Sequence, residues 1–146
     1  MAATRSAHTV WEGSLFKGSG VVAFDSSGAI AEQPVTWASR AEEANGKTSP
    51  EELIAAAHSA CYAMSLSNEV EVAGGTPRTL EVVAEVSLGP DPTGGFRLTS
   101  IALTVAGDVE GLDSAGFEAA AEAAKVGCPV SKALTGVDIT LNVSTR

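Results

Sequence analysis

The sequence predicts an α+β domain with a mainly antiparallel sheet. Three observations lead to this fold class: strand-like segments separated by turns precede Arg40, one long segment without proline or glycine follows, and two long alternating segments come after it. The complete order is strands, helix, strands, helix, strand. At 146 residues, the chain is expected to form a single domain over residues 1–146.

The N-terminal segment predicts a meander of short strands. Residues 8–16 and 21–24 have the apolar residues of strands, and the glycines within residues 18–20 predict a turn between them. We expect a third strand at Val35–Ala38, and the polar residues 40–47 predict a loop.

The long helix has the clearest signals in the sequence, and we expect it from Pro50 to about Ala73. Ser49 is a good N-cap, Pro50 suits the first helical position, and Glu52 completes a capping box. A pair of glycines ends the helix. Residues 55–66 are apolar nearly all round, which predicts that the middle of this helix is buried.

The remaining segments complete the α+β order. Leu80–Leu88 and Phe96–Ala106 alternate between apolar and polar residues, which predicts two strands joined by a loop rich in glycine and proline. Asp113 is the expected cap of a second helix, and residues 128–134 predict a short third one. Val137–Val143 predicts a closing strand.

The charge of the chain restricts its partners. The formal net charge is −9 and no cluster of Lys or Arg exists, so a phosphate backbone would be repelled and nucleic acid is not an expected partner. No apolar run approaches the ~20 residues that span a bilayer. The N-terminus lacks the apolar stretch of a signal peptide. We therefore expect a cytoplasmic protein without membrane contact.

The two cysteines, Cys61 and Cys128, are too few for a disulfide scaffold. In a reducing compartment they are core residues, metal ligands or redox-active groups. Cys61 lies in the middle of the long helix, where a packed core thiol and a reactive thiol are equally open interpretations. Cys128 lies at the predicted N-cap of the short helix, where N–H groups and the helix dipole favour a thiolate.

A metal site has little support in the sequence. His58 and Cys61 are three positions apart and could face one ion, but structural zinc needs four ligands, and no second close pair exists. The sequence therefore predicts no metal and no cofactor. His58 is expected to be a packed or hydrogen-bonded helix residue.

Two motifs resemble the OsmC/Ohr family of peroxidases. Residues 48–61 (TSPEELIAAAHSAC) resemble the signature helix of the family, and residues 127–134 (GCPVSKAL) resemble its second-cysteine motif. With the opening Trp11-Glu12-Gly13, the resemblance covers nearly the whole chain and favours the OsmC branch. It implies an OsmC-like fold, in which mainly antiparallel sheets wrap a long central helix in an intertwined homodimer.

The resemblance also implies a thiol peroxidase. Cys61 would reduce an organic hydroperoxide to an alcohol and become a sulfenic acid, and Cys128 would condense with it to a disulfide. A dithiol reductant, of lipoyl type by the same resemblance, would restore the thiols. The family's glutamate matches Glu51. Its arginine matches Arg40 in OsmC-type members, whereas Ohr-type members carry it nearer the N-terminus, where this chain has Lys17.

A reactive Cys61 requires a nearby cation, because burial alone raises the pKa of a thiol. Arg40 is the candidate, since an arginine stays charged even when partly buried, and Glu51 is expected to hold it in place. Glu51 and Cys61 are ten positions apart on one helix, or ~15 Å along its axis. We therefore expect them to meet between two copies with antiparallel helices, which gives two shared sites in a dimer.

Two rival functions remain open. The first is a non-enzymatic stress-response protein of the same fold, which binds a lipid-like ligand and senses oxidation. The second is a thiol hydrolase or acyltransferase that uses Cys61 with His58, although it lacks a third orienting group and gives Cys128 no role. Apolar residues such as Leu53 and Met64 predict a site that prefers organic hydroperoxides to hydrogen peroxide.

Overall fold

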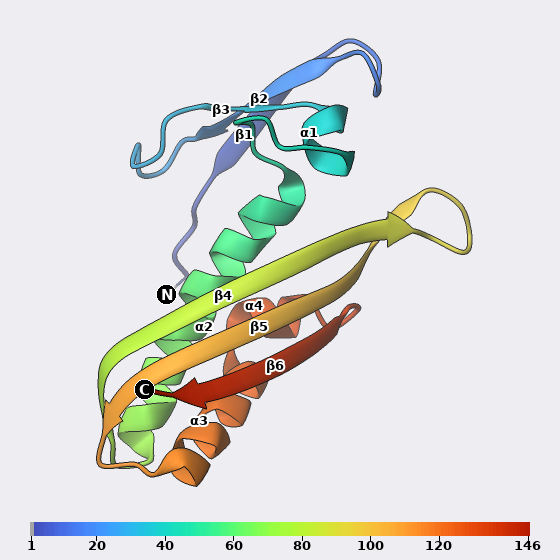
Figure 1. Ribbon diagram of the computed structural model, residues 1–146. Coiled ribbons are helices and arrows are strands. Elements are labelled where there is room, and N and C mark those ends of the chain that lie inside the picture. The colour runs from blue at the N-terminus through green and yellow to red at the C-terminus, as the bar shows by residue number, and fades with distance from the viewer. Residues whose placement is uncertain (1) are drawn as a thin grey trace. The chain divides into compact units, whose positions relative to one another are not determined.

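A computed structural model describes residues 2–146 (Figure 1). The elements are, in order, β1 (Ala7–Glu12), β2 (Ser19–Phe24), β3 (Gln33–Val35), α1 (Trp37–Ala41), α2 (Pro50–Val72), β4 (Thr76–Pro90), β5 (Phe96–Glu110), α3 (Ser114–Gly127), α4 (Pro129–Ala133) and β6 (Asp138–Thr145). Helices and mainly antiparallel strands confirm the predicted α+β class.

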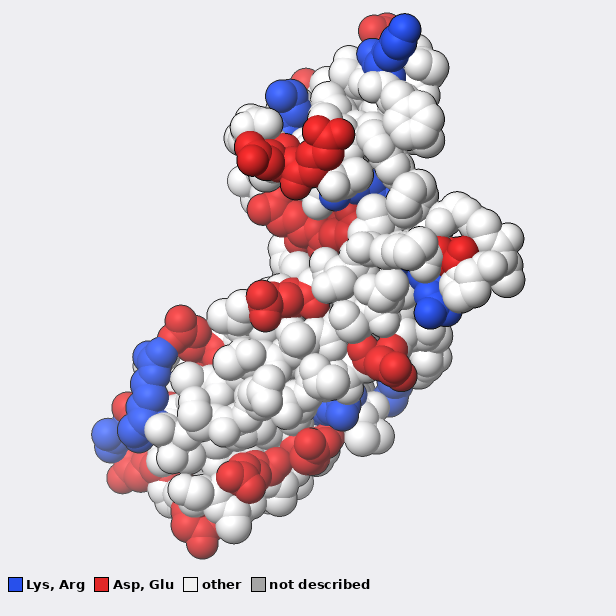
Figure 2. Space-filling model, turned by 45° about the vertical axis from the view of Figure 1, so that its right-hand side comes forward, with Lys and Arg blue, Asp and Glu red and all other residues white. Residues whose placement is uncertain are grey.

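The chain divides into two compact units. The first ends at Leu53 and the second spans Ile54–Arg146. The organisation of residues 1–146 as a single domain stays a prediction. Within residues 2–146, none of the helices combines the length and apolarity needed to cross a membrane. On the face shown in Figure 2, acidic side chains form several separate groups and basic ones are fewer.

The first unit contains the predicted meander. Strands β1, β2 and β3 form an antiparallel sheet in sequential order, with Val10 opposite Val21. Gly20 on β2 allows the Trp11 indole to lie against the strand, because a Cβ there would come within 2.8 Å of indole Cε3. β1 is shorter than the predicted strand over residues 8–16, since it ends at Glu12 before a glycine with a positive φ angle.

A third strand is present, but it is Gln33–Val35 and the segment after it is helical, so the prediction of a strand is wrong for residues 36–38, as is the start of the predicted loop. Thr36 is the N-cap of α1. Its hydroxyl accepts a hydrogen bond from the Ser39 N–H, and the Ser39 hydroxyl accepts one from the Thr36 N–H, both at 3.0 Å. This capping box fixes a helical turn in spite of the β-propensity of Thr36 and Trp37. It also places Arg40 in the last turn of α1.

Helix α2 begins at Pro50, as predicted. The Ser49 hydroxyl accepts a hydrogen bond from the Glu52 N–H at 3.1 Å. The Glu52 carboxylate accepts a hydrogen bond from the Thr48 hydroxyl at 2.6 Å, one residue before the partner that a capping box predicts. The side chains of Thr48, Ser49 and Glu52 therefore form the hydrogen bonds around the N-cap.

The C-terminus of α2 is a Schellman motif. Gly74 has a φ angle of 89°, and the Gly75 N–H donates to the Val70 carbonyl at 2.9 Å. The positive φ angle explains why a glycine lies at this position. The helix ends at Val72, one residue before the predicted boundary.

Helix α2 buries one stripe of side chains. Tyr62, Leu66 and Val70, spaced four residues apart, are fully buried. Met64 is 71% exposed, and Ala57 is also exposed. The prediction that the middle of the helix is buried is therefore wrong for a single chain, because a second apolar face of α2 is left uncovered.

The second unit packs helices against one face of a sheet. β4 and β5 form a long antiparallel hairpin, and β6 adds to β5 in parallel (Figure 1). The core combines residues of α2, β5 and α3 with the cysteine that precedes α4: Tyr62, Leu66, Val70, Leu103, Val105, Phe117, Ala120, Ala121, Ala124 and Cys128. This core holds the segment before α4 against the middle of α2.

Candidate active site

The structure brings the two cysteines of the second unit together. The Cys61 and Cys128 sulfur atoms lie 3.4 Å apart, although the residues are 67 positions apart in sequence. Both are free thiols; Cys128 is buried, and Cys61 is partly exposed. A disulfide has an S–S length of about 2.05 Å, so a small side-chain movement would join them.

Two helices fix the positions of these sulfur atoms. Cys61 lies in the fourth turn of α2, beside the buried Tyr62, whose hydroxyl donates to the Ala121 carbonyl of α3 at 2.7 Å. Cys128 ends α3, because its N–H donates to the Ala124 carbonyl at 2.8 Å, and it is also the N-cap of α4. Pro129 occupies the first helical position, where its missing N–H has no cost.

The two thiols have opposite pKa shifts. Burial raises the pKa of the Cys61 thiol, against a hydrogen bond with the Val130 backbone that lowers it, and Cys128 raises it further. Burial also acts to raise the pKa of Cys128, but hydrogen bonds to the Ser131 backbone, to Cys61 and to the Ser131 hydroxyl outweigh it and lower the pKa. Among the described residues, no cation contributes to the shift at Cys61.

Cys61 opens into a cavity of about 390 Å³. The residues that line this cavity come from α2, from the end of α3 and from the start of α4: Cys61, Met64, Ser65, Asn68, Glu69, Gly127 and Pro129. A small molecule can therefore approach the Cys61 sulfur, whereas Cys128 lies behind it in the core.

The first unit contains the predicted arginine–glutamate pair. Arg40 Nε donates to Glu51 Oε1 at 3.0 Å and to Oε2 at 3.2 Å, and Nη2 donates to Oε1 at 2.8 Å. Glu51 is only 7% exposed. The Arg40 guanidinium carbon also lies 6.0 Å from the centre of the Trp37 ring, within the range of a cation–π interaction. The carboxylate and the indole together fix the direction of the guanidinium.

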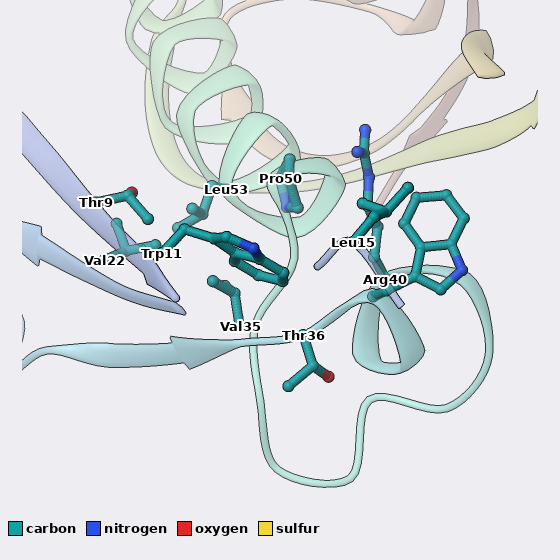
Figure 3. A pocket seen from close by; sticks show the side chains of 10 residues that line it. Thr9, Trp11, Leu15, Val22, Val35, Thr36, Arg40, Pro50 and Leu53 are labelled. Atoms are coloured by element: carbon teal, nitrogen blue, oxygen red, sulfur yellow. The ribbon is translucent and has the colours of Figure 1, made fainter. Parts of the chain in front are cut away.

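An apolar cavity of about 540 Å³ lies next to this pair (Figure 3). Arg40 is its charged residue, and the others come from β1, the turn after β1, β2, β3, the N-cap and first residue of α1 and the start of α2: Thr9, Trp11, Leu15, Val22, Val35, Thr36, Trp37, Pro50 and Leu53. Of the residues expected in an apolar site, Leu53 lines this cavity and Met64 lines the one at Cys61. The arrangement suits a molecule with an apolar body and a polar group beside the guanidinium.

His58 is bonded to a serine. Its Nε2 lies 2.7 Å from Ser131 Oγ, and both side chains are buried. Burial lowers the pKa of His58. A Cys61–His58 pair of the hydrolase type would need the histidine bonded to the cysteine, so this geometry gives that rival no support. Within residues 2–146, no group of three potential metal ligands is found.

Sequence reasoning missed Ser131 and Tyr62. Ser131 lies inside the second-cysteine motif, three residues after Cys128, but no sequence signal identifies its hydrogen-bond partner, His58. Tyr62 follows Cys61 directly, and a buried tyrosine hydroxyl needs a partner. No sequence signal identifies its partner, the Ala121 carbonyl.

Comparison with known proteins gives a consistent set of relatives. Residues 43–142 match the OsmC family, described as OsmC-like protein. The chain is 42% identical over 132 residues to the peroxiredoxin OsmC of Escherichia coli, covering 90% of both chains. It is 36% identical over 110 residues to the organic hydroperoxide resistance protein OhrA of Bacillus subtilis, covering 72% of this chain and 73% of that one.

Solved structures extend the similarity to the fold. The organic hydroperoxide resistance protein OhrB of Bacillus subtilis is similar with a TM-score of 0.76 at 27% identity, covering 95% of this chain and 98% of that chain. An organic hydroperoxide resistance protein OsmC from Legionella pneumophila gives a TM-score of 0.72 at 27% identity, covering 98% and 99% of the two chains.

Proposed function

The chain belongs to the OsmC family, and from this premise we propose that it is a thiol-dependent peroxidase that reduces organic hydroperoxides. The observation that carries the proposal is the distance of 3.4 Å between the Cys61 and Cys128 sulfur atoms. Relatives named as a peroxiredoxin and as organic hydroperoxide resistance proteins support the same chemistry. The predicted cytoplasmic location belongs to the same proposal.

The reaction has three steps. The Cys61 thiolate attacks one peroxide oxygen, the O–O bond breaks, the alcohol leaves with a proton, and Cys61 becomes a sulfenic acid. The Cys128 thiolate attacks the Cys61 sulfur, hydroxide leaves as water, and a disulfide forms. A dithiol reductant, of lipoyl type by family resemblance, then reduces this disulfide and is itself oxidised to a disulfide.

We further propose that Arg40 and Glu51 act on the Cys61 of a second copy. Helix α2 is continuous from Pro50 to Val72, so Glu51 and Cys61 are ~15 Å apart along one helix axis. A reactive Cys61 needs a nearby cation, and among the described residues none contributes to the pKa shift of this thiol. The uncovered face of α2 around Met64, and exposed apolar residues of the first unit such as Phe16, support an antiparallel homodimer that would cover them.

Shared sites can be tested by mixing two inactive variants. Arg40→Ala and Cys61→Ser proteins, unfolded together and refolded, are expected to recover about one quarter of the wild-type activity, because half of the dimers would be mixed and each would hold one intact site. A mixture of Cys61→Ser and Cys128→Ser proteins is the matched control and should stay inactive, since these two sulfur atoms meet within one chain. Sites formed within single chains would leave both mixtures inactive.

The apolar cavity beside Arg40 supports a preference for organic hydroperoxides, because its walls would bind the organic group and the guanidinium would face the peroxide. The test is steady-state turnover of cumene hydroperoxide and of hydrogen peroxide with dihydrolipoamide as reductant. We expect sustained turnover, higher efficiency with cumene hydroperoxide, and loss of turnover in Cys61→Ser and Cys128→Ser. Oxidation that stops after one equivalent would favour the non-enzymatic redox sensor, and equal efficiencies would refute the apolar preference.

A further inference from the structure

Two contacts join residues 128–131 to α2, about one helical turn apart. His58 Nε2 lies 2.7 Å from Ser131 Oγ. The Cys61 and Cys128 sulfur atoms lie 3.4 Å apart. His58 is three residues before Cys61, whereas Ser131 is three residues after Cys128. The two segments therefore run antiparallel here, and the histidine–serine bond and the pair of sulfur atoms are adjacent cross-links between them.

The histidine–serine bond is the buried anchor of α4. A helix as short as Pro129–Ala133 is not stable by itself, so its position depends on contacts with the rest of the fold. Within α4, which the structure describes in full, Ser131 is the one buried residue, with 4% of its surface exposed. Val130 packs against the core but is only partly buried. The polar contact with the fully buried His58 therefore fixes α4 on α2.

The His58 ring is the donor in this bond. Burial lowers the pKa of His58, so the ring is neutral near pH 7 and has one N–H and one lone pair. Nδ1 is buried and has no hydrogen-bond partner among the described residues. A buried N–H without an acceptor costs more than a lone pair without a donor, so the proton is on Nε2 and is donated to Ser131 Oγ. A side chain that replaces His58 must supply an N–H donor at the position of Nε2.

We propose that His58 is a positioning residue whose hydrogen bond to Ser131 keeps the Cys128 sulfur within bonding reach of the Cys61 sulfur. The proposal rests on the proposed peroxidase function and assigns His58 a task after the peroxide has reacted. Disulfide formation must shorten the distance between the sulfur atoms from 3.4 Å to about 2.05 Å. A fixed cross-link one turn away allows this side-chain movement and prevents α4 from moving away from α2.

The position of Cys128 decides what becomes of oxidised Cys61. To form the disulfide, the Cys128 sulfur attacks the sulfenic sulfur, the S–O bond breaks, and the oxygen leaves as water with the Cys128 proton. A second hydroperoxide competes, because it can transfer one oxygen atom to the sulfenic sulfur, leave as an alcohol and produce an irreversible sulfinic acid. Cys61 lines a cavity that is open to such a molecule. A Cys128 sulfur that stays within reach therefore protects Cys61 from irreversible oxidation.

The direct test is the reduction potential of the disulfide between Cys61 and Cys128. The protein is equilibrated in dithiothreitol buffers of graded potential, and the free thiols are alkylated and measured by mass spectrometry. Ser131→Ala and His58→Leu are each expected to lower the equilibrium constant for disulfide formation about tenfold, because sulfur atoms that are held less closely have a lower effective concentration. A tenfold change in this constant makes the potential about 30 mV less negative.

Rescue by a side chain of matching reach separates positioning from packing. His58→Gln places an amide N–H near the position of Nε2 and should restore the wild-type potential, whereas the shorter side chain of His58→Asn should not. The double variant His58→Leu/Ser131→Ala should shift the potential no further than either single variant, because the two side chains make one bond. Ser59→Ala is the matched control, since the Ser59 hydroxyl donates to the Ala56 carbonyl of its own helix, and it should keep the wild-type potential.

Three results would overturn the role of His58. The first is a wild-type potential in Ser131→Ala, which removes one oxygen atom and should fold normally. The second is a potential in His58→Gln equal to that in His58→Leu. The third is a double variant in which the two single shifts add, because the side chains would then act separately.

Oxidation by excess cumene hydroperoxide without reductant tests the protection of Cys61. At one peroxide concentration, Ser131→Ala should form sulfenic acid at the wild-type rate but give about tenfold more sulfinic acid relative to disulfide. A wild-type ratio of the two products in this variant would overturn the protective role. A wild-type protein that forms neither sulfenic acid nor disulfide would overturn the peroxidase function instead, whereas the potential, measured without peroxide, tests the role of His58 separately.

Discussion

Replacing Glu51 by glutamine tests whether the Glu51 carboxylate orients the Arg40 guanidinium. In the structure, the Glu51 carboxylate accepts three hydrogen bonds from Arg40 at 2.8–3.2 Å, and Glu51 is 7% exposed. Glutamine keeps the shape and one oxygen acceptor but loses the negative charge. Arg40 would then be free to turn toward solvent, since its side chain is already 32% exposed.

The expected loss of activity in Glu51→Gln follows from the charged hydrogen bonds between Arg40 and Glu51 that the variant loses. Hydrogen bonds to charged groups contribute about 1.5–3 kcal/mol each, and partial exposure of Arg40 reduces the loss to the range of a single such bond. If that energy orients the guanidinium toward the peroxide, kcat/KM for cumene hydroperoxide should fall roughly 10- to 150-fold.

The assay is steady-state peroxide reduction, with urea unfolding to verify that the variant is folded. Glu52→Gln is the matched control, because Glu52 is the adjacent carboxylate but bonds to the Thr48 hydroxyl, and its activity should stay within about twofold of wild type. A folded Glu51→Gln protein with wild-type kcat/KM would refute the role of the pair.

Three other predictions test the packing and the charge of the site. Tyr62→Phe removes the 2.7 Å hydrogen bond to the buried Ala121 carbonyl, so urea unfolding should show a loss of about 1–3 kcal/mol; an unchanged free energy of unfolding would contradict the importance of this bond. Gly107→Ala would place a Cβ too close to the Phe117 ring and should lower the free energy of unfolding by about 1–3 kcal/mol. Gly136→Ala, with open space around it, is the control and should have little effect; equal losses in the two variants would show that the close approach is unimportant. Arg40→Met should move the pH midpoint of the Cys61 reaction with peroxide upward, because a nearby cation stabilises the thiolate and lowers its pKa, whereas burial raises it; an unchanged midpoint would exclude Arg40 as that cation.

The elements with strong local signals were predictable from the sequence. The start of α2 follows from Ser49 and Pro50, and its end from a pair of glycines. The N-cap of α3 at Asp113 is also confirmed, because its side chain accepts from the Gly116 N–H at 2.8 Å. These signals act within one turn of the helix, so they need no knowledge of the rest of the fold.

The predictions were wrong where specific side-chain contacts, rather than local residue preferences, determine the structure. The turn at Thr36 is helical because two side chains cap it reciprocally, although the same residues are common in strands. The apolar circumference of α2 was interpreted as burial on all sides, but the chain covers only the stripe that contains Tyr62. The packing of distant strands and helices decides which apolar face of α2 is buried. The helical pattern alone carries no information on that packing.

The two cysteines of the candidate site could be predicted from the sequence, but the hydrogen bond between His58 and Ser131 could not. The motifs around Cys61 and Cys128 indicated both cysteines, yet the bond from His58 to Ser131 joins residues 73 positions apart. Its existence depends on the docking of α4 against α2 in the second unit. A pattern of residue types does not state which serine a buried histidine will contact.

The most direct measurement is the product of one equivalent of cumene hydroperoxide added to the reduced protein without reductant. We expect intact-mass analysis to show the loss of two hydrogen atoms per chain, and peptide mapping to show a disulfide between Cys61 and Cys128 of the same chain. A stable sulfinic acid at Cys61 with a free Cys128 thiol, or a disulfide that links two chains, would contradict the two-cysteine mechanism.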